Sequence, residues 1–186
     1  MNIRRVVTGH NEKRKSIVAL DGRPPWSKEF EHTPGFASAL VWSTSAPTKI
    51  PAGGEDVTQT VTSFVPGPGG SVFLMVTFPP DSVMADPSFD PVAAGQEFAE
   101  ESPGLVDHFE PDAPGMHTTP TVDYGIVLDG EIWLELDDGE TVHLKTHDVI
   151  VQNNTRHAWR NKSTAPTKMA FVLLGGSPSG ASRERS

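Results

Sequence analysis

The chain has 186 residues, of which 36% are hydrophobic, so it is long enough for one folded domain with some peripheral structure. Its formal net charge of −9 argues against nucleic-acid binding, which needs a basic face for phosphate contacts. Because the chain contains no cysteine, disulfides, thiolate nucleophiles and thiolate metal ligands are excluded.

The amino-terminal residues lack the apolar core of a secretory signal. No run in the chain approaches the roughly 18 to 20 apolar residues that a membrane span requires. We therefore expect a soluble, cytoplasmic protein with neither a membrane nor a nucleic acid as its partner.

Short apolar runs, rich in β-branched and aromatic residues, alternate with turns that contain proline and glycine. Such runs are typical of β-strands. The predicted strands are, in chain order, 15–20, 37–44, 71–78, 123–129, 131–137, 140–145, 148–151, 156–160 and 167–174. So many short strands, separated by tight turns, indicate an all-β barrel or sandwich.

One stretch, 91–101, is predicted to be a helix. Asp90 can cap it, Pro91 suits its first turn, and Pro103 follows its end. The acidic run 97–102 is expected to be a solvated face of this helix. The small polar residues of 176–186 predict a disordered tail.

The predicted elements divide the chain into two parts. Residues 1–104 supply strands and the short helix, but no convergent group of catalytic residue types. Residues 105–175 form a compact run of strands that holds most of the seven histidines. We therefore expect the barrel core and its chemistry in 105–175, with 1–104 extending the barrel.

A histidine and a carboxylate share a face near the start of this core. Side chains alternate faces along a strand, so residues an even number apart point the same way. His117 is in phase with Asp123, whereas Tyr124 faces away. The turn 128–131, which contains Gly130, predicts a hairpin after this strand.

A second histidine follows a tight turn. Asn154 suits the positive φ of that turn, and His157 and Trp159 share one face of the strand after it. Asn161 lies four residues beyond the histidine. The two histidine segments could therefore contribute to one site.

Together these segments resemble the two motifs of the cupin superfamily. His117 matches the first histidine of the first motif and Gly130 its hairpin glycine, while His157 and Asn161 match the end of the second motif. The first motif departs from the family at two positions, because Thr119 replaces a second histidine and Asp123 replaces a glutamate. The resemblance implies a double-stranded β-helix (jelly-roll) barrel with extra N-terminal strands and one short helix.

The resemblance also implies a metal site. Cupins commonly hold iron, manganese, nickel or zinc with three histidines and one glutamate. Here it implies a divalent ion, Fe, Zn, Mn or Ni, with His117, Asp123 and His157 as both ligands and catalytic residues. Two histidines and one carboxylate suit non-haem iron, although zinc could also use them. Without a metal, the same three residues would form an acid–base cluster.

Other side chains are assigned around this site. The expected substrate-binding residues are Thr119, Trp133, Gln152 and Trp159, with Arg160 as a further polar candidate. The remaining histidines, His10, His32, His108, His143 and His147, are expected to be structural or surface residues.

These features predict a metal-dependent small-molecule enzyme of the cupin type. It would act on a small organic acid, polyketide-like or aromatic substrate by lyase, isomerase or decarboxylase chemistry. The alternatives are a non-haem iron dioxygenase, a metal-free acid–base isomerase, and a non-catalytic barrel that binds a small ligand. By analogy with cupins, the N-terminal strands would pair with a second subunit to form a homodimer.

Overall fold

The computed structural model describes residues 1–50 and 54–177. Its strands are β1 (Arg5–His10), β2 (Ser16–Gly22), β3 (Ser27–Glu29), β4 (Ala37–Thr44), β5 (Ser71–Phe78), β6 (Thr121–Asp129), β7 (Glu131–Glu135), β8 (Thr141–Lys145), β9 (Val149–Asn153), β10 (Ala158–Arg160) and β11 (Thr167–Gly175). The α-helix is α1 (Pro91–Glu101), and the 3-10 turns are η1 (Val57–Thr60), η2 (Asp81–Val83), η3 (Val106–His108) and η4 (Asp137–Gly139). No helix in the described ranges is long and apolar enough to cross a membrane.

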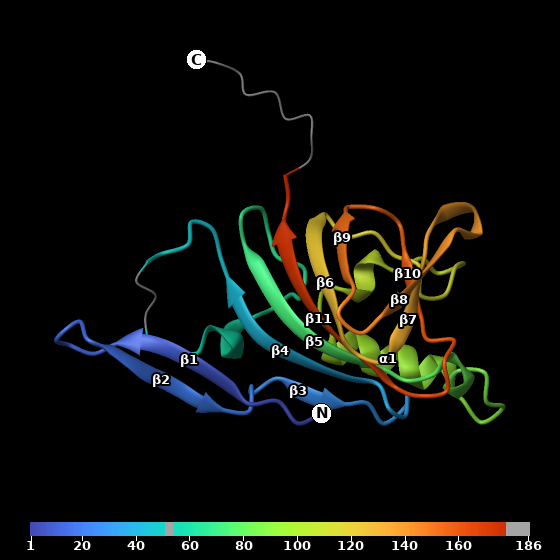
Figure 1. Ribbon diagram of the computed structural model, residues 1–186, viewed down its shortest axis with the longest axis horizontal. Helices are drawn as coiled ribbons and strands as arrows, with labels where there is room; N and C mark the ends of the chain where they lie inside the picture. The colour runs from blue at the N-terminus through green and yellow to red at the C-terminus, as the bar shows by residue number, and fades with distance from the viewer. Residues whose placement is uncertain (51–53, 178–186) are drawn as a thin grey trace, which may run out of the picture.

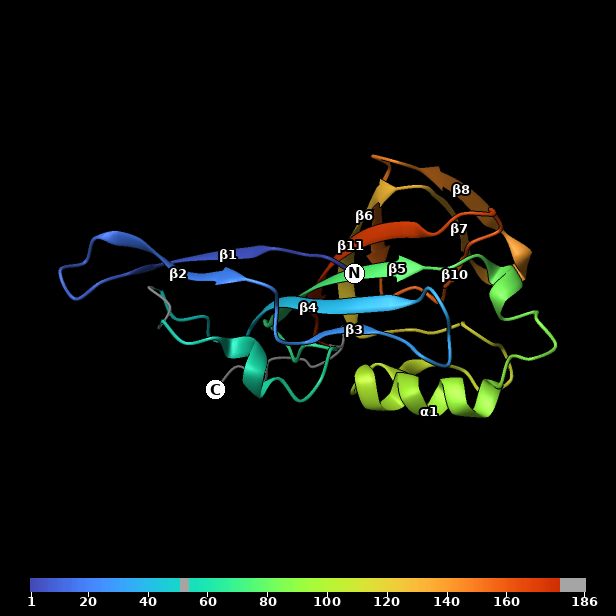
Figure 2. The same cartoon turned by 90° about the horizontal axis from the view of Figure 1, so that it is seen from below.

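The strands form two sheets and a separate hairpin (Figure 1). The larger sheet has the order β3-β4-β5-β11-β6-β9 and the smaller one β10-β7-β8, and all paired neighbours are antiparallel. The hairpin β1-β2 extends away from both sheets, and α1 lies below β3 and β4 in Figure 2. Strands from 1–104 and from 105–175 therefore share the larger sheet.

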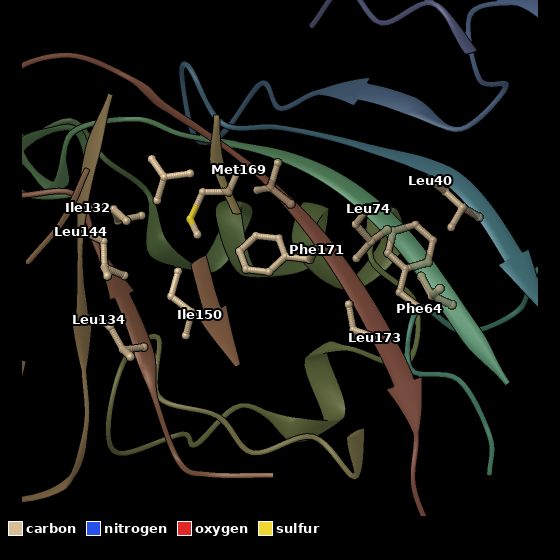
Figure 3. Packing of buried hydrophobic residues seen from close by; sticks show 13 residues of the cluster. Leu40, Phe64, Leu74, Ile132, Leu134, Leu144, Ile150, Met169, Phe171 and Leu173 are labelled. Carbon is tan, nitrogen blue, oxygen red and sulfur yellow. The ribbon is translucent and has the colours of Figure 1, made fainter. Parts of the chain in front are cut away.

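The hydrophobic core fills the space between the two sheets (Figure 3). The inward residues of β7 and β8 are Ile132, Leu134 and Leu144, and they are buried with Phe171 of β11 and Ile150 of β9. Burial of such side chains is the main favourable contribution to folding. The alternation of apolar and polar residues along β7 thus places Ile132 and Leu134 towards the core. On β6 and β9, by contrast, the buried face carries the polar residues Asp123 and Gln152.

The core also requires a small residue beneath one aromatic ring. Gly125 of β6 pairs with Phe171 of β11, and a Cβ atom at Gly125 would lie 3.2 Å from the Phe171 ring. Such a contact is tighter than ordinary van der Waals distance, so a larger residue would displace the ring. Gly125 therefore leaves room for the Phe171 ring. Asp123 lies two residues before Gly125 on β6 and points to the same face of the sheet.

The helix α1 is attached to the sheet through a buried carboxylate. As predicted, Asp90 caps the helix, accepting hydrogen bonds from the amides of its first turn. Glu97, however, is buried and accepts hydrogen bonds from the backbone N–H groups of Glu31 at 2.8 Å and His32 at 2.7 Å. The prediction of a solvated acidic face is therefore wrong for Glu97, because its carboxylate holds the loop after β3.

The end of the chain is described only in part. The backbone N–H of Gly176 donates to the carbonyl of Pro120 at 2.9 Å, so this residue of the predicted tail is paired. The rest of the predicted disordered tail, 178–186, lies outside the described residues.

A candidate active site in the barrel

A cavity of about 290 Å³ lies inside the barrel, close to the lower limit of typical small-molecule sites. Most of its wall is apolar, and its aromatic members include Phe36, Phe64, Phe78, Phe98, Phe109 and Phe171. Polar interactions inside the cavity are consequently stronger than they would be at the surface.

The polar part of the wall contains the residues predicted from the two motifs. His117, Asp123, His157, Thr119 and Gln152 all line the cavity. His117 and His157 face each other across two backbone hydrogen bonds of 3.0 Å, and Asp123 of β6 pairs with Gln152 of β9. The structure thus brings the predicted catalytic residues and two predicted substrate-binding residues to one wall.

Each imidazole is oriented by a backbone carbonyl. Nδ1 of His117 lies 3.0 Å from the Gly115 oxygen, and Nδ1 of His157 lies 2.9 Å from the Thr155 oxygen. A carbonyl oxygen can only accept, so Nδ1 carries the proton in both rings and Nε2 carries the lone pair. The ring centroids are 4.2 Å apart. The two neighbouring rings therefore each have an Nε2 atom that can accept a proton.

Burial keeps both imidazoles neutral. Burial, together with a smaller effect of the neighbouring His117, lowers the pKa of His157 to about 4. Burial likewise lowers the pKa of His117, with a smaller contribution from His108. His108, expected to be a loop histidine, is half-buried and close enough to His117 to affect its titration.

Asp123 and Gln152 each have one unpartnered polar atom. Asp123 is 8% exposed, and its Oδ1 has no hydrogen-bond partner among the described residues. Burial raises the pKa of Asp123, against an opposing effect of the Thr121 and Thr119 hydroxyls. Gln152 accepts a hydrogen bond from Thr155 at its Oε1, whereas its Nε2 is unpartnered in the described chain. The wall thus offers an acceptor beside a donor.

The two tryptophans predicted to bind substrate have different positions. Trp159 lines the cavity, and its ring lies 5.7 Å from the His157 ring. Trp133 is not part of the cavity wall, because Ile132 and Leu134 occupy the inward positions of β7. Its ring instead stacks on His143 at 4.1 Å on the outer face. Trp133 therefore lies outside the cavity that the other three predicted substrate-binding residues line.

Other residues matched to the motifs support the backbone. Gly130 has φ 87°, and Asn154 has φ 54°, as the turn chemistry predicts. Asn161 is fully buried, and its Nδ2 donates to the carbonyls of Phe78 at 3.0 Å and Ala165 at 2.9 Å. These contacts fix the chain after β10, so Asn161 holds the segment that carries His157 and Trp159.

The donor groups fit a metal ion only in part. Within residues 1–50 and 54–177, no three His, Cys, Asp or Glu side chains are close enough together to bind one ion. The two imidazoles approach each other, but Asp123 does not complete a three-ligand group. Aspartate is one methylene shorter than the glutamate of the family motif, and Thr119 supplies no nitrogen in place of the second histidine. The described geometry therefore does not form the predicted three-ligand centre.

The comparison with protein families identifies the barrel. Residues 106–173 match the family model described as Cupin domain. These residues therefore form a cupin domain. The predicted jelly-roll fold, with its two antiparallel sheets, is therefore confirmed.

Three relatives of this cupin come from fungi. Phomopsin biosynthesis cluster protein C′ of Diaporthe leptostromiformis is 56% identical over 64 residues, which is 34% of each chain. Oryzines biosynthesis cluster protein J of Aspergillus oryzae is 40% identical over 74 residues, covering 39% of this chain and 41% of the relative. The cupin-domain-containing oxidoreductase virC of Hypocrea virens is 42% identical over 66 residues, or 34% of each chain. The match thus spans well under half of the length of these relatives.

Among solved structures, this cupin is similar to a conserved protein with a double-stranded β-helix domain from Klebsiella pneumoniae. The two chains are 16% identical with a TM-score of 0.37, and the alignment covers 63% of this chain and 74% of the other.

Proposed function

We propose that this cupin is a biosynthetic enzyme that binds a largely apolar, aromatic or polyketide-like molecule in the barrel and transfers a proton within it. The observation that supports this proposal is the pair of imidazoles, His117 and His157, each with its Nε2 lone pair available in the cavity that also contains the unpartnered Oδ1 of Asp123. A base with a defined tautomer inside an apolar cavity is suited to general acid–base catalysis.

The wall can orient the reacting group. Nε2 of Gln152 is a free donor and Oδ1 of Asp123 a free acceptor, and the two residues are directly paired between β6 and β9. A hydroxyl or an enol both accepts and donates, so it satisfies both atoms at once. In the proposed reaction, Nε2 of His157 removes a proton from the carbon next to a carbonyl. Where a carbon–carbon double bond follows that carbon, the electron pair forms a dienolate, and return of the proton from Nε2 to the far carbon of the double bond gives the conjugated isomer.

The names of two relatives and the apolar cavity wall support this proposal. These two relatives are named for the phomopsin and oryzines biosynthesis clusters. These names favour a role in a biosynthetic pathway. The aromatic wall of the cavity favours a substrate that is largely apolar.

A metal-dependent oxidoreductase is the second candidate. Relatives named as cupin-domain-containing oxidoreductases favour it, and His117 and His157 offer two nitrogen donors on neighbouring positions. An ion such as iron, zinc, manganese or nickel would supply Lewis-acid or redox chemistry if it were held there. Asp123 would then be the third ligand only if its carboxylate moved closer to the two rings.

Proton exchange with solvent distinguishes the two candidates. 1-Phenylbutane-1,3-dione and related aryl ketones would be incubated with the protein in D₂O and chelator, and deuterium at the carbon next to the carbonyl followed by NMR. The proposal expects exchange that is at least about tenfold slower with His157→Ala and Asp123→Asn, but unchanged with Tyr124→Phe, whose ring lies on the outer face.

Elemental analysis of the untagged protein completes the test. The oxidoreductase would be supported instead by two results. The wild type would contain about one metal ion per chain and turn over substrate without chelator, and His157→Ala would lose both the ion and the turnover. Equal exchange rates in the wild type and the His157→Ala variant would refute the acid–base proposal.

A further inference from the structure

The cavity contains a third unpartnered polar group, on a strand that is three positions from β6 in the sheet. Ser38 lies on β4, is 5% exposed, and its Oγ has no hydrogen-bond partner among the described residues. Ser38 also lines the cavity. A buried hydroxyl without a partner costs free energy, so its retention calls for a ligand or another physical reason.

The unpartnered atoms are concentrated in this cavity. The described residues have five buried side-chain atoms without a partner, and three of them belong to cavity residues, namely Ser38, Asp123 and Gln152. The other two, on Arg5 and Trp26, belong to residues outside its wall. Such a distribution indicates that the missing partners belong to a molecule that occupies the cavity.

The three groups lie at two separate places in the sheet. The order β4-β5-β11-β6 separates Ser38 from Asp123 by three strand spacings, or about 14 Å across the sheet. The wall between them is apolar, with Val76 paired directly to Ser38 and Leu173 paired directly to Asp123. The cavity is therefore polar at both ends and apolar between them.

The wall also constrains the charge of the occupant. Among the described residues, Arg160 is the one lysine or arginine that lines the cavity, and its Nε donates to Glu135. The cavity thus offers no unpaired cation for a carboxylate. A neutral hydroxyl or carbonyl fits Ser38 better, because a serine hydroxyl can donate to either.

We propose that Ser38 forms a distal subsite, which binds a neutral oxygen at the far end of an elongated and otherwise apolar substrate. The reacting oxygen of the same molecule lies at Asp123 and Gln152. This inference rests on the proposed function for the reacting end, and it specifies the substrate class as a molecule with an oxygen at each end of an apolar skeleton.

Two phenols test the subsite, because they differ only at the far end. 4-Hexylphenol ends in a methyl group and 4-(6-hydroxyhexyl)phenol in a hydroxyl. Their dissociation constants would be measured by calorimetry with the wild type, Ser38→Ala and Ser43→Ala. Ser43 is the matched control, since it lies on β4 but outside this cavity. We expect Ser38→Ala to weaken binding of the hydroxylated phenol by about tenfold relative to hexylphenol.

The controls separate this inference from the proposed function. Asp123→Asn should change the affinity for both phenols by a similar factor, because they share the phenol end. An unchanged ratio in Ser38→Ala, or no binding of either phenol by the wild type, would overturn the subsite. The deuterium exchange measured with His157→Ala would still decide the proposed function, since it does not depend on Ser38.

Discussion

At the scale of single residues, the backbone determines what the two cavity histidines can do. The carbonyls of Gly115 and Thr155 each accept the Nδ1 proton, and the opposite nitrogen is left to act in the cavity. Phe109 stacks on His117 at 4.5 Å and restricts rotation of that ring. Sequence spacing predicted the two histidines, but it could not predict Phe109, whose contact depends on the bridge between Phe109 and His117.

The stability of the folded chain should depend on pH through His157. Its pKa is 6.5 in the unfolded chain and about 4 when folded, so the unfolded state binds more protons between these values. The free energy of unfolding should therefore be highest above about pH 6.5 and decrease towards pH 4, by up to about 3 kcal/mol. His117 shifts in the same direction. Urea unfolding at several pH values, with chelator present, measures this decrease.

Two variants isolate the histidine contribution. His157→Gln should flatten the pH dependence. Asp123 acts in the opposite direction, because its raised pKa makes the folded state the better proton acceptor at acid pH. Asp123→Asn should therefore steepen the decrease below about pH 6.5. A pH profile that is identical in wild type and His157→Gln would contradict this assignment.

Restoring the second motif histidine should create a metal site. Thr119 lines the cavity and is 3% exposed, and it occupies the position where the family motif has a histidine. Thr119→His would add a third imidazole to the pair already present. We expect it to bind Zn²⁺ at least about tenfold more tightly than the wild type. Competition with a chromophoric chelator measures this affinity.

Thr119→Val is the matched control, because it changes the same buried position without adding a donor. The gain should also disappear when Thr119→His is combined with His157→Ala. Equal Zn²⁺ affinities for Thr119→His and Thr119→Val, with both variants folded by circular dichroism, would show that this position does not face the histidine pair.

At the scale of elements, prediction succeeded where local signals were strong. The strands 37–44 and 71–78 and the helix 91–101 are present with the predicted bounds. β1 and β3 were missed, because β1 is short and carries polar residues at both ends, and β3 consists of three polar residues. Their pairing partners, β2 and β4, decide their structure, and such non-local pairing is not visible in a single strand.

Glu97 shows that contacts between distant segments also decide burial on a helix, and that sequence alone does not reveal them. Its neighbours on α1 suggest an exposed acidic face, but the loop after β3 supplies two backbone N–H donors to its carboxylate. Glu97→Ala would leave both donors without their partner, and we expect it to lower the free energy of unfolding by about 2 to 4 kcal/mol. Glu97→Gln keeps one acceptor oxygen and should cost less. Urea unfolding measures both.

The exposed Glu100 of the same helix provides the comparison. Glu100→Ala should change the free energy of unfolding by no more than about 0.5 kcal/mol. If Glu97→Ala were as mild as Glu100→Ala, the two hydrogen bonds to the loop would contribute nothing measurable to stability.

At the scale of the whole molecule, the cavity depends on segments that are far apart in the sequence. Ser38 comes from β4, Phe98 from α1, and Asp123 and His157 from the two motif segments. The motifs could be recognised because each lies within a few residues. The far end of the cavity could not, because a serine in a largely apolar strand has no sequence pattern that marks it as a binding residue.

The projecting hairpin β1-β2 is joined to the body by a buried ion pair. The guanidinium of Arg5, at the start of β1, contacts the carboxylate of Asp56, and Nη1 also donates to the Val41 carbonyl at 3.2 Å. Both side chains are less than a tenth exposed. Removing one partner leaves the other charge buried and unpaired, which costs far more than the loss of a surface pair.

We therefore expect Arg5→Ala to lower the free energy of unfolding by about 3 to 5 kcal/mol. The adjacent Arg4 is the control, because it forms an exposed pair with Asp21 that should contribute less than about 1 kcal/mol. Adding Asp56→Ala to the Arg5 variant should recover part of the loss, since it removes the unpaired carboxylate. Urea unfolding of the three variants measures these differences. Equal losses for Arg4→Ala and Arg5→Ala would mean that the hairpin is not anchored through this pair.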